Sequence, residues 1–181
     1  MMFSCTDRIK SLTSIALLLL LLLCLNIQCT KQLQATRKCN IKTTVDKLGT
    51  YIMTVDNFIG NNTDDELNIV LIRKPNAFRL IFIVKYIGPK WIFIEAGESL
   101  VLNVDGSKMG FSGYGSEGHK DVIPGGLVSE KATYDITPEQ LKMISNANEV
   151  KFKLVDVEYQ LSTSNIECFR YFYEKYVVPI Q

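Results

Sequence analysis

Short apolar runs, separated by turn sequences, dominate the chain between residues 50 and 111. The run Leu80–Ile87 is apolar on both sides of an extended chain, which is typical of a central strand that is covered on both faces. Gly, Pro, Asn and Asp gather between the runs and favour turns. We therefore expect successive strands, of which the first three are residues 51–55, 67–72 and 80–87.

Two more strands are expected at residues 91–94 and 100–104, which are again apolar and rich in β-branched residues. Asp105 and Gly106 follow directly. This dipeptide favours the positive φ angles of a tight hairpin, so the strand 100–104 should fold back on residues 109–111.

The pattern becomes helical in the C-terminal half of the chain. Thr137, Pro138 and Gln140 have the spacing of a capping box with proline at the first helical position, which predicts a helix to about Ala147. A second capping box, Ser164 with Glu167, predicts a helix towards Pro179. An alternating strand at residues 150–154 and a hairpin to residues 159–161 lie between the two.

Together these elements predict one α+β domain over residues 41–181. We expect a mostly antiparallel β-sheet or sandwich with two short helices in the C-terminal half. Residues 30–40 are polar and without periodicity, which indicates a tether in front of the domain.

The first 29 residues have the layout of a secretory signal peptide. Arg8 and Lys10 precede an apolar stretch over residues 15–25, and polar residues follow it. The apolar stretch is about half of the roughly 20 residues that a membrane-spanning helix needs. We therefore expect residues 1–29 to be a signal peptide and the protein to be exported, with a retained signal anchor or a short membrane-buried helix as the alternative.

Cys29 is a candidate lipid attachment site. The stretch Leu25–Cys29 resembles a bacterial lipoprotein signal, in which the cysteine after the apolar region is acylated and holds the domain on the membrane. Asn26 and Gln28 stand where that signal usually has an aliphatic and a small residue. Ordinary cleavage after Cys29, releasing a protein that starts at Thr30, is the alternative.

Charge and cysteine content narrow the classes of partner. Without residues 1–29 the chain has equal numbers of acidic and basic side chains, so composition gives no reason to expect nucleic-acid binding. Cys39 and Cys168 are the only cysteines left in the domain. In an oxidising compartment they are expected to form one disulfide, and a buried free Cys168 is the alternative.

The stretch Gly110–Gly126 contains the spacing GxGxxG and the only histidine, His119. A dinucleotide site requires a helix directly after these glycines, and residues 119–126 are unsuited to one. We interpret the stretch as a surface loop whose candidate binding residues are Tyr114, Glu117 and His119. We expect no catalytic residue, metal site or cofactor.

Aromatic residues surround the last predicted helix, where a surface helix needs them on one stripe only. Tyr171 and Phe172 are therefore candidates for a face that binds a partner, because interfaces favour aromatic residues. The alternative is that Phe169, Tyr173 and Tyr176 belong to the core and that Tyr171 and Phe172 are half-exposed anchors.

Two stretches carry a resemblance to a protein family. They are WIFIEAGESLVLNVDG, which begins at Trp91, and GGLVSEKATYDITPEQLKMISNANEVKFKLV, which ends at Val155. With the terminal helix, roughly Trp91 to Gln181 resembles a family of uncharacterised bacterial exported proteins and lipoproteins. The resemblance implies an exported domain without a known activity, and it transfers no catalytic residue.

These expectations combine into a non-enzymatic protein of the cell envelope, or one that is periplasmic or secreted, acting as a binding or structural module. Its partners would be the membrane, if Cys29 is acylated, and an unidentified protein or small molecule. The alternatives are a carrier of a small or apolar ligand, suggested by the two-sided run Leu80–Ile87, and a small hydrolase with an unconventional site.

Overall fold

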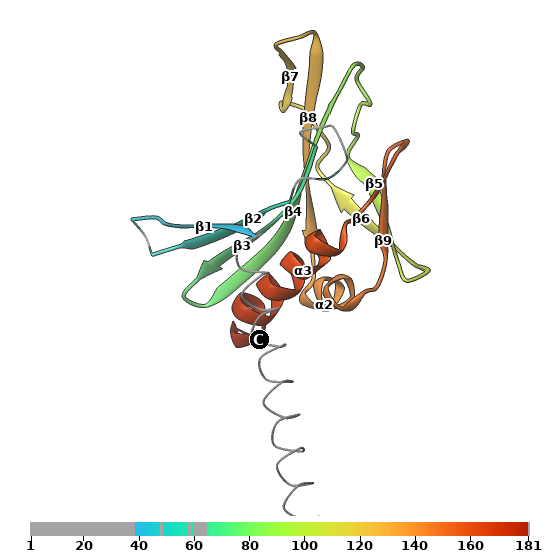
Figure 1. Ribbon diagram of the computed structural model, residues 1–181. Helices are drawn as coiled ribbons and strands as arrows, with labels where there is room; N and C mark the ends of the chain where they lie inside the picture. The colour runs from blue at the N-terminus through green and yellow to red at the C-terminus, as the bar shows by residue number, and fades with distance from the viewer. Residues whose placement is uncertain (1–38, 48, 58, 60–64, 181) are drawn as a thin grey trace, which may run out of the picture.

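The computed structural model describes residues 39–47, 49–57, 59 and 65–180 (Figure 1). The predicted signal peptide, Cys29 and residues 30–38 of the predicted tether lie outside the described residues. Residues 39 and 40, which were expected to belong to the tether, are part of the domain, because Asn40 already begins the first strand and Cys39 is buried.

One ten-stranded antiparallel sheet forms the body of the domain, in the spatial order β1-β2-β3-β4-β8-β6-β5-β9-β10 with β7 paired to β8. The sheet is open, so the α+β class is confirmed and the alternative of a sandwich is not adopted. The strands are β1 (Asn40–Val45), β2 (Tyr51–Asp56), β3 (Glu66–Lys74), β4 (Ala77–Gly88), β5 (Gly97–Val104), β6 (Ser107–Gly113), β7 (Lys120–Ile123), β8 (Leu127–Ile136), β9 (Val150–Leu154) and β10 (Val157–Gln160).

Two α-helices follow β8 and β10: α2 (Pro138–Asn146) and α3 (Thr163–Phe172). The capping box of α2 is as expected, since the Thr137 side chain accepts from the Gln140 amide. The predicted cap of α3 is wrong by two residues. Ser162, not Ser164, is the N-cap, because Asn165 completes the box by accepting from the Ser162 amide at 3.0 Å.

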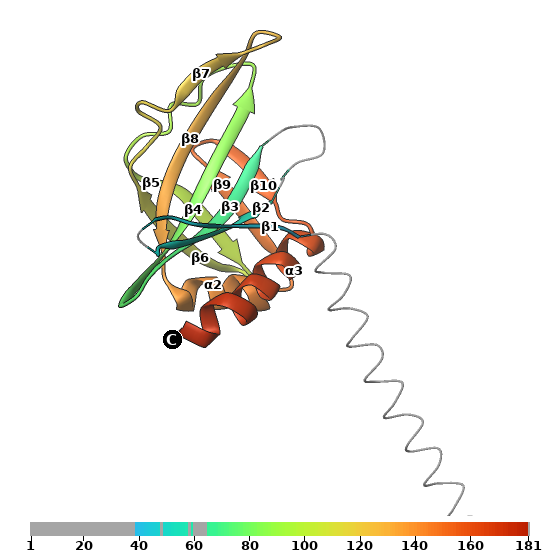
Figure 2. The ribbon, with the colours of Figure 1, turned by 90° about the vertical axis from the view of Figure 1, so that its left-hand side faces the viewer.

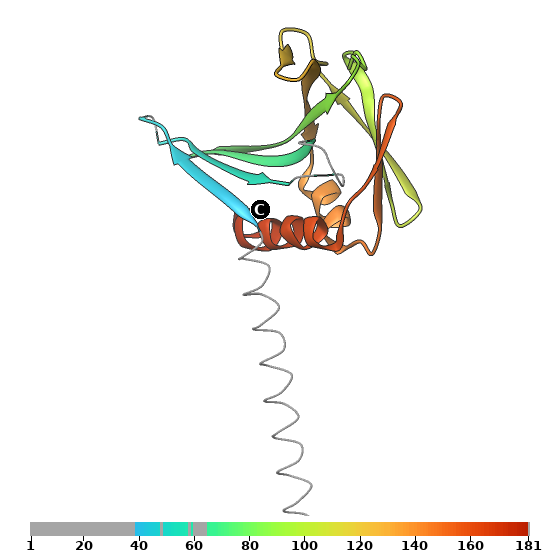
Figure 3. The ribbon, with the colours of Figure 1, turned by 45° about the horizontal axis from the view of Figure 1, so that its top comes forward.

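Beyond Phe172 the chain continues as one turn of π-helix, η1 (Tyr173–Val177), and a 3₁₀ turn, η2 (Val178–Ile180). The sheet curls, and α2 and α3 both lie on its inner side (Figures 2 and 3). The Phe82 ring contacts those of Phe111 and Phe169, with centroids 5.7 and 6.0 Å apart. These three rings join β4, β6 and α3 in one core.

The hairpin predicted at Asp105-Gly106 is confirmed between β5 and β6, with φ angles of 48° and 90° at its two turn residues. The Asp105 carboxylate also accepts from the amides of Asn148 and Glu149, at 3.1 and 2.8 Å. The turn therefore also fixes the loop between α2 and β9.

The strand expected at residues 91–94 is absent, since this stretch is irregular. Phe93 has a φ of 53°, which interrupts an extended strand. The cause is a buried carboxylate from β8 that binds the amides of this segment, described below.

A disulfide joins Cys39 to Cys168, with the two Cα atoms 5.5 Å apart. This is the pairing that the sequence analysis expects. It ties the beginning of β1, an edge strand whose residues are mostly exposed, to the buried side of α3.

We expect the double substitution Cys39→Ala with Cys168→Ala to lower the free energy of unfolding. The bridge spans 129 residues, and a loop of that size corresponds to about 5 kcal/mol in the chain-entropy model. Urea unfolding of the two proteins measures the difference. Equal urea midpoints would show that the bridge adds no stability.

Candidate binding surfaces

The three residues of the predicted binding loop are all exposed. Tyr114 is 69% exposed, and Glu117 and His119 also face solvent. The loop is shaped by Gly115 and Gly118, whose φ angles are 72° and 78°. Among the described residues, no hydrogen bond or ion pair joins the three side chains to one another, so they form a surface and not an assembled site.

Glu130, on the inner side of β8, fixes this loop and the segment of residues 92–94. Its side chain is fully buried. Oε1 accepts from the amides of Ile92 and Phe93 at 2.6 and 3.0 Å. Oε2 accepts from the Ile94 amide at 3.0 Å and from the Ser116 hydroxyl at 2.8 Å. We call this set of contacts the Glu130 clamp; it joins residues 92–94 to Ser116 through one carboxylate.

Burial has the largest single effect on the Glu130 carboxyl and on its own raises the pKa, because it penalises the charged form. The bonds from Ile94, Ser116, Ile92 and Phe93 act in the opposite direction and together hold the pKa below its ordinary value. Glu130 is therefore a charged structural anchor with four donors, and not a proton donor.

The sequence analysis missed Glu130, although the pattern contained a signal. The inward-facing residues of β8 alternate as Val128, Glu130, Ala132, Tyr134 and Ile136. Glu130 is the one charged residue in that series, and a charge at a core position must be paired or hydrogen-bonded.

The clamp holds Phe93 in a backbone conformation that costs a non-glycine residue about 1 kcal/mol or more. The Phe93 ring is nevertheless 60% exposed, and the Lys120 ammonium lies 5.2 Å from its centroid. Phe93 thus sits rigidly at the surface, next to the β7–β8 hairpin.

The predicted partner face at Tyr171 and Phe172 is wrong for Phe172, which is fully buried in the core. Helical spacing places Phe172 on the same side of α3 as Phe169. Tyr171 is half-buried, and its hydroxyl accepts from the Lys175 ammonium at 2.6 Å. Lys175 also lies over the ring of Tyr176, 5.3 Å from its centroid. The outward side of α3 and η1 is formed instead by Tyr171, Lys175 and Tyr176.

A groove of about 630 Å³ runs over the outer face of β5, β6, β9 and β10; we call it the lysine groove. Register places Asn103 opposite both Lys108 and Lys151, and Lys151 opposite Gln160. Four side chains with hydrogen-bond donors therefore lie in one row across four strands. The lining is Val101, Asn103, Lys108, Lys151, Phe152, Lys153, Glu158, Tyr159 and Gln160.

One carboxylate of the protein already binds in this row. Glu149 Oε1 accepts from the Lys151 ammonium at 2.9 Å and from the Gln160 amide at 3.3 Å. The Glu149 and Lys151 side chains are 50% and 54% exposed. Exposed pairs of this kind contribute only about 0–1 kcal/mol, so another anion can replace Glu149 at little cost.

The other two lysines of the groove differ in their pairing. The Lys153 ammonium lies 3.7 Å from an oxygen of Asp156, which is 91% exposed. Lys108 is exposed and makes no ion pair with any described residue. The sequence analysis placed Lys151 and Lys153 only within an alternating strand over residues 150–154. Their placement beside Asn103 and Lys108 depends on sheet register, which the pattern of residues does not give.

No three His, Cys, Asp or Glu side chains within the described ranges are grouped so that they could hold a metal ion. In the same ranges, none of the helices combines the length and the apolar character needed to cross a membrane. Comparisons with protein-family models, with curated proteins and with solved structures found no match.

We expect Glu130→Gln to lower the free energy of unfolding by roughly 3 kcal/mol, because the new amide group faces donors and the remaining oxygen carries no charge. Chemical denaturation measures the loss. Glu117→Gln is the matched control, since Glu117 is exposed, and it should leave stability unchanged. A loss of the same size in both variants would contradict the role given to the clamp.

The stability lost in Glu130→Gln, relative to the native protein, should depend on pH. The Glu130 pKa is lowered in the folded protein. Its contribution to stability is therefore complete above the ordinary carboxyl pKa of 4.5 and is lost as the pH falls through the folded pKa. The stability difference between the native protein and Glu130→Gln should narrow from pH 7 to pH 3, as followed by thermal unfolding. A constant difference would show that Glu130 is not ionised in the fold.

Proposed function

We propose that this protein is an exported, non-enzymatic binding module of the cell envelope, or of the periplasmic or secreted space, and that the lysine groove is its binding site. The row of donors formed by Lys108, Asn103, Lys151 and Gln160 carries the proposal. These side chains come from four neighbouring strands, so the sheet holds their spacing without a ligand.

The Cys39–Cys168 disulfide supports the part of the proposal that concerns export. Disulfides persist in oxidising compartments outside the cytosol. The charged and apolar layout of residues 1–29 agrees with that route. Acylation at Cys29 would hold the domain on the membrane through residues 30–38.

The chemistry of the groove favours an anionic ligand that also carries hydroxyl or carbonyl groups. Ammonium groups of Lys108 and Lys151 suit carboxylate or sulfate oxygens. The amides of Asn103 and Gln160 both donate and accept, so they suit neutral oxygens and hydroxyls. An acidic oligosaccharide combines these groups in an extended chain, and we propose it as the ligand class.

The alternatives have less support. A carrier of an apolar ligand would need space inside the curled sheet, and the rings of Phe82, Phe111 and Phe169 occupy that interior. A hydrolase would need a nucleophile near His119. The hydroxyl of the nearby Ser116 is buried and is engaged by Glu130 and the Ile94 carbonyl.

We expect Lys108→Gln combined with Lys151→Gln to weaken the binding of a sulfated oligosaccharide at least about tenfold, because each charge-assisted hydrogen bond contributes about 1.5–3 kcal/mol. Isothermal titration calorimetry with a dextran sulfate oligosaccharide measures the change, and uncharged dextran should not bind. The affinity of the native protein should also fall as salt is raised.

Lys142→Gln is the control, since Lys142 is exposed on α2 and lies outside the groove. An equal loss of affinity in this variant would attribute binding to net charge and not to the groove. The proposal fails if the native protein binds neither sulfated nor carboxylated oligosaccharides at millimolar concentration.

A further inference from the structure

The lysine groove contains a second row of residues beside its row of donors. Val101 lies opposite Gly110 on one side and opposite Lys153 on the other, and Lys153 lies opposite Glu158. We call these four positions the second row. Each of them is two residues along its strand from one of the donors, so both rows lie on the outer face. Two residues of an antiparallel strand span about 6.8 Å, which is therefore the approximate distance between the rows.

The second row has an excess of negative charge. Lys153 is the one cation among its four positions, and Asp156 already lies 3.7 Å from that ammonium. Glu158 adds a second carboxylate opposite Lys153. A third belongs to Glu98, which lies directly over Gly110, where a side chain would collide with it. Glu158 and Glu98 are both exposed, and neither makes an ion pair with any described residue.

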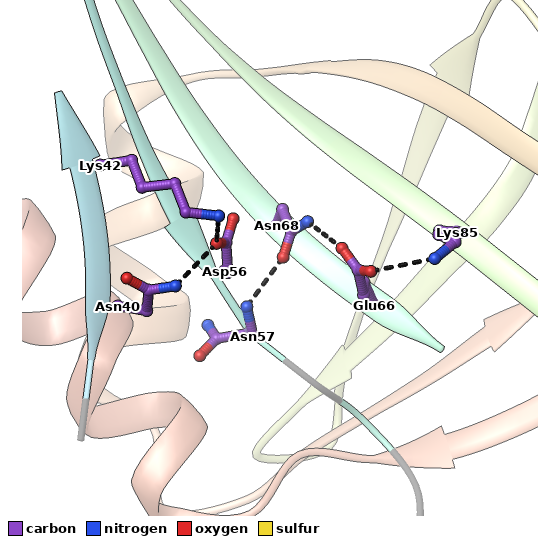
Figure 4. A network of polar contacts seen from close by, with 7 residues as sticks. All are labelled: Asn40, Lys42, Asp56, Asn57, Glu66, Asn68 and Lys85. Carbon is purple, nitrogen blue, oxygen red and sulfur yellow. Dashed lines mark hydrogen bonds and ion pairs between the residues drawn. The ribbon is translucent and has the colours of Figure 1, made fainter. Parts of the chain in front are cut away.

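Carboxylates on the other half of the outer face have lysine partners. Asp56 pairs with the Lys42 ammonium, and Glu66 lies 3.2 Å from the Lys85 ammonium (Figure 4). An asparagine side chain also donates to each of these carboxylates, at 3.0 and 2.6 Å. The two glutamates of the second row lack such a lysine, so they can bind a cation from outside the protein.

The charges of the two rows favour a ligand that is itself of mixed charge. An anionic group at the second row would meet Glu158 and Glu98, and like charges placed together at an interface oppose binding. An ammonium group at the same place would form charge-assisted hydrogen bonds with these carboxylates. Val101 is half-buried between them and offers an apolar contact to the C–H groups of a sugar ring.

We propose that Glu158 is the specificity-determining residue of the lysine groove, and that the ligand is an acidic oligosaccharide that also contains amino sugars with free ammonium groups. The acid groups bind at Lys108 and Lys151. An ammonium group about 7 Å away, on a neighbouring sugar, binds at Glu158 with Glu98 as the second acceptor. This inference rests on the proposed function and narrows its ligand class.

Two heparin octasaccharides that differ only at nitrogen test the inference. In the first the N-sulfates are removed to leave free amines, and in the second the same amines are acetylated. At about pH 6 the free amines are protonated. We expect the native protein to bind the free-amine form at least about threefold more tightly in isothermal titration calorimetry, as exposed charge pairs allow. A site that recognised only negative charge would prefer the acetylated form, because that form is the more anionic of the two.

We expect Glu158→Gln to lose this preference, because the amide carries no charge, and to bind the acetylated form at least as tightly as the native protein does. Glu98→Gln should reduce the preference in the same direction. Glu139→Gln is the matched control, since Glu139 is exposed on α2, lies outside the groove and changes the net charge by the same amount. This control should keep the full preference.

Equal affinities of the native protein for the two octasaccharides, or tighter binding of the acetylated form, overturn the inference and leave the proposed function intact, because the acid groups still bind. A Glu158→Gln variant that keeps the full preference also overturns it, as does a Glu139→Gln control that loses the preference equally. If the native protein binds neither octasaccharide at millimolar concentration, the inference and the proposed function both fail.

Discussion

Filling the inner side of the curled sheet is the constraint on which the rest of this structure depends. Two short helices and the rings of Phe82, Phe111 and Phe169 supply the buried contacts there. Because these helices are used on the inner side, no helix of the described residues covers the outer side (Figure 3). The lysine groove lies on this outer side of the sheet.

Two long-range ties hold the parts of the sheet that local contacts leave weak. The Cys39–Cys168 disulfide fixes the edge strand β1, whose residues are otherwise mostly exposed. The Glu130 clamp fixes residues 92–94, which have no strand partner, through bonds to their backbone amides. Each tie connects residues far apart in sequence, so each reduces the freedom of a segment that secondary structure alone does not order.

The sequence correctly predicted the elements that depend only on residues close together in the chain. The capping box at Thr137 and the hairpin at Asp105-Gly106 depend on residues next to one another, and both appear where expected. Residues 91–94 have the composition of a strand, but their amides bind Glu130, which lies 36 residues from Ile94. Phe172 was misplaced because the aromatic residues around α3 do not show which side faces the sheet. The lysine groove depends on register between four strands, and no short stretch of sequence contains that information.

The lysine groove lies on one side of the junction between β6 and β8, and strands β1 to β4 lie on the other side. These strands are in register only at Gly113 and Tyr134. A side chain at Gly113 would collide with the Thr133 carbonyl and the Tyr134 ring, so the close crossing requires glycine. One continuous core under both sides holds the junction, since Phe82 of β4 contacts Phe111 of β6 across it. A ligand in the lysine groove would therefore bind to a rigid support that includes both parts of the sheet.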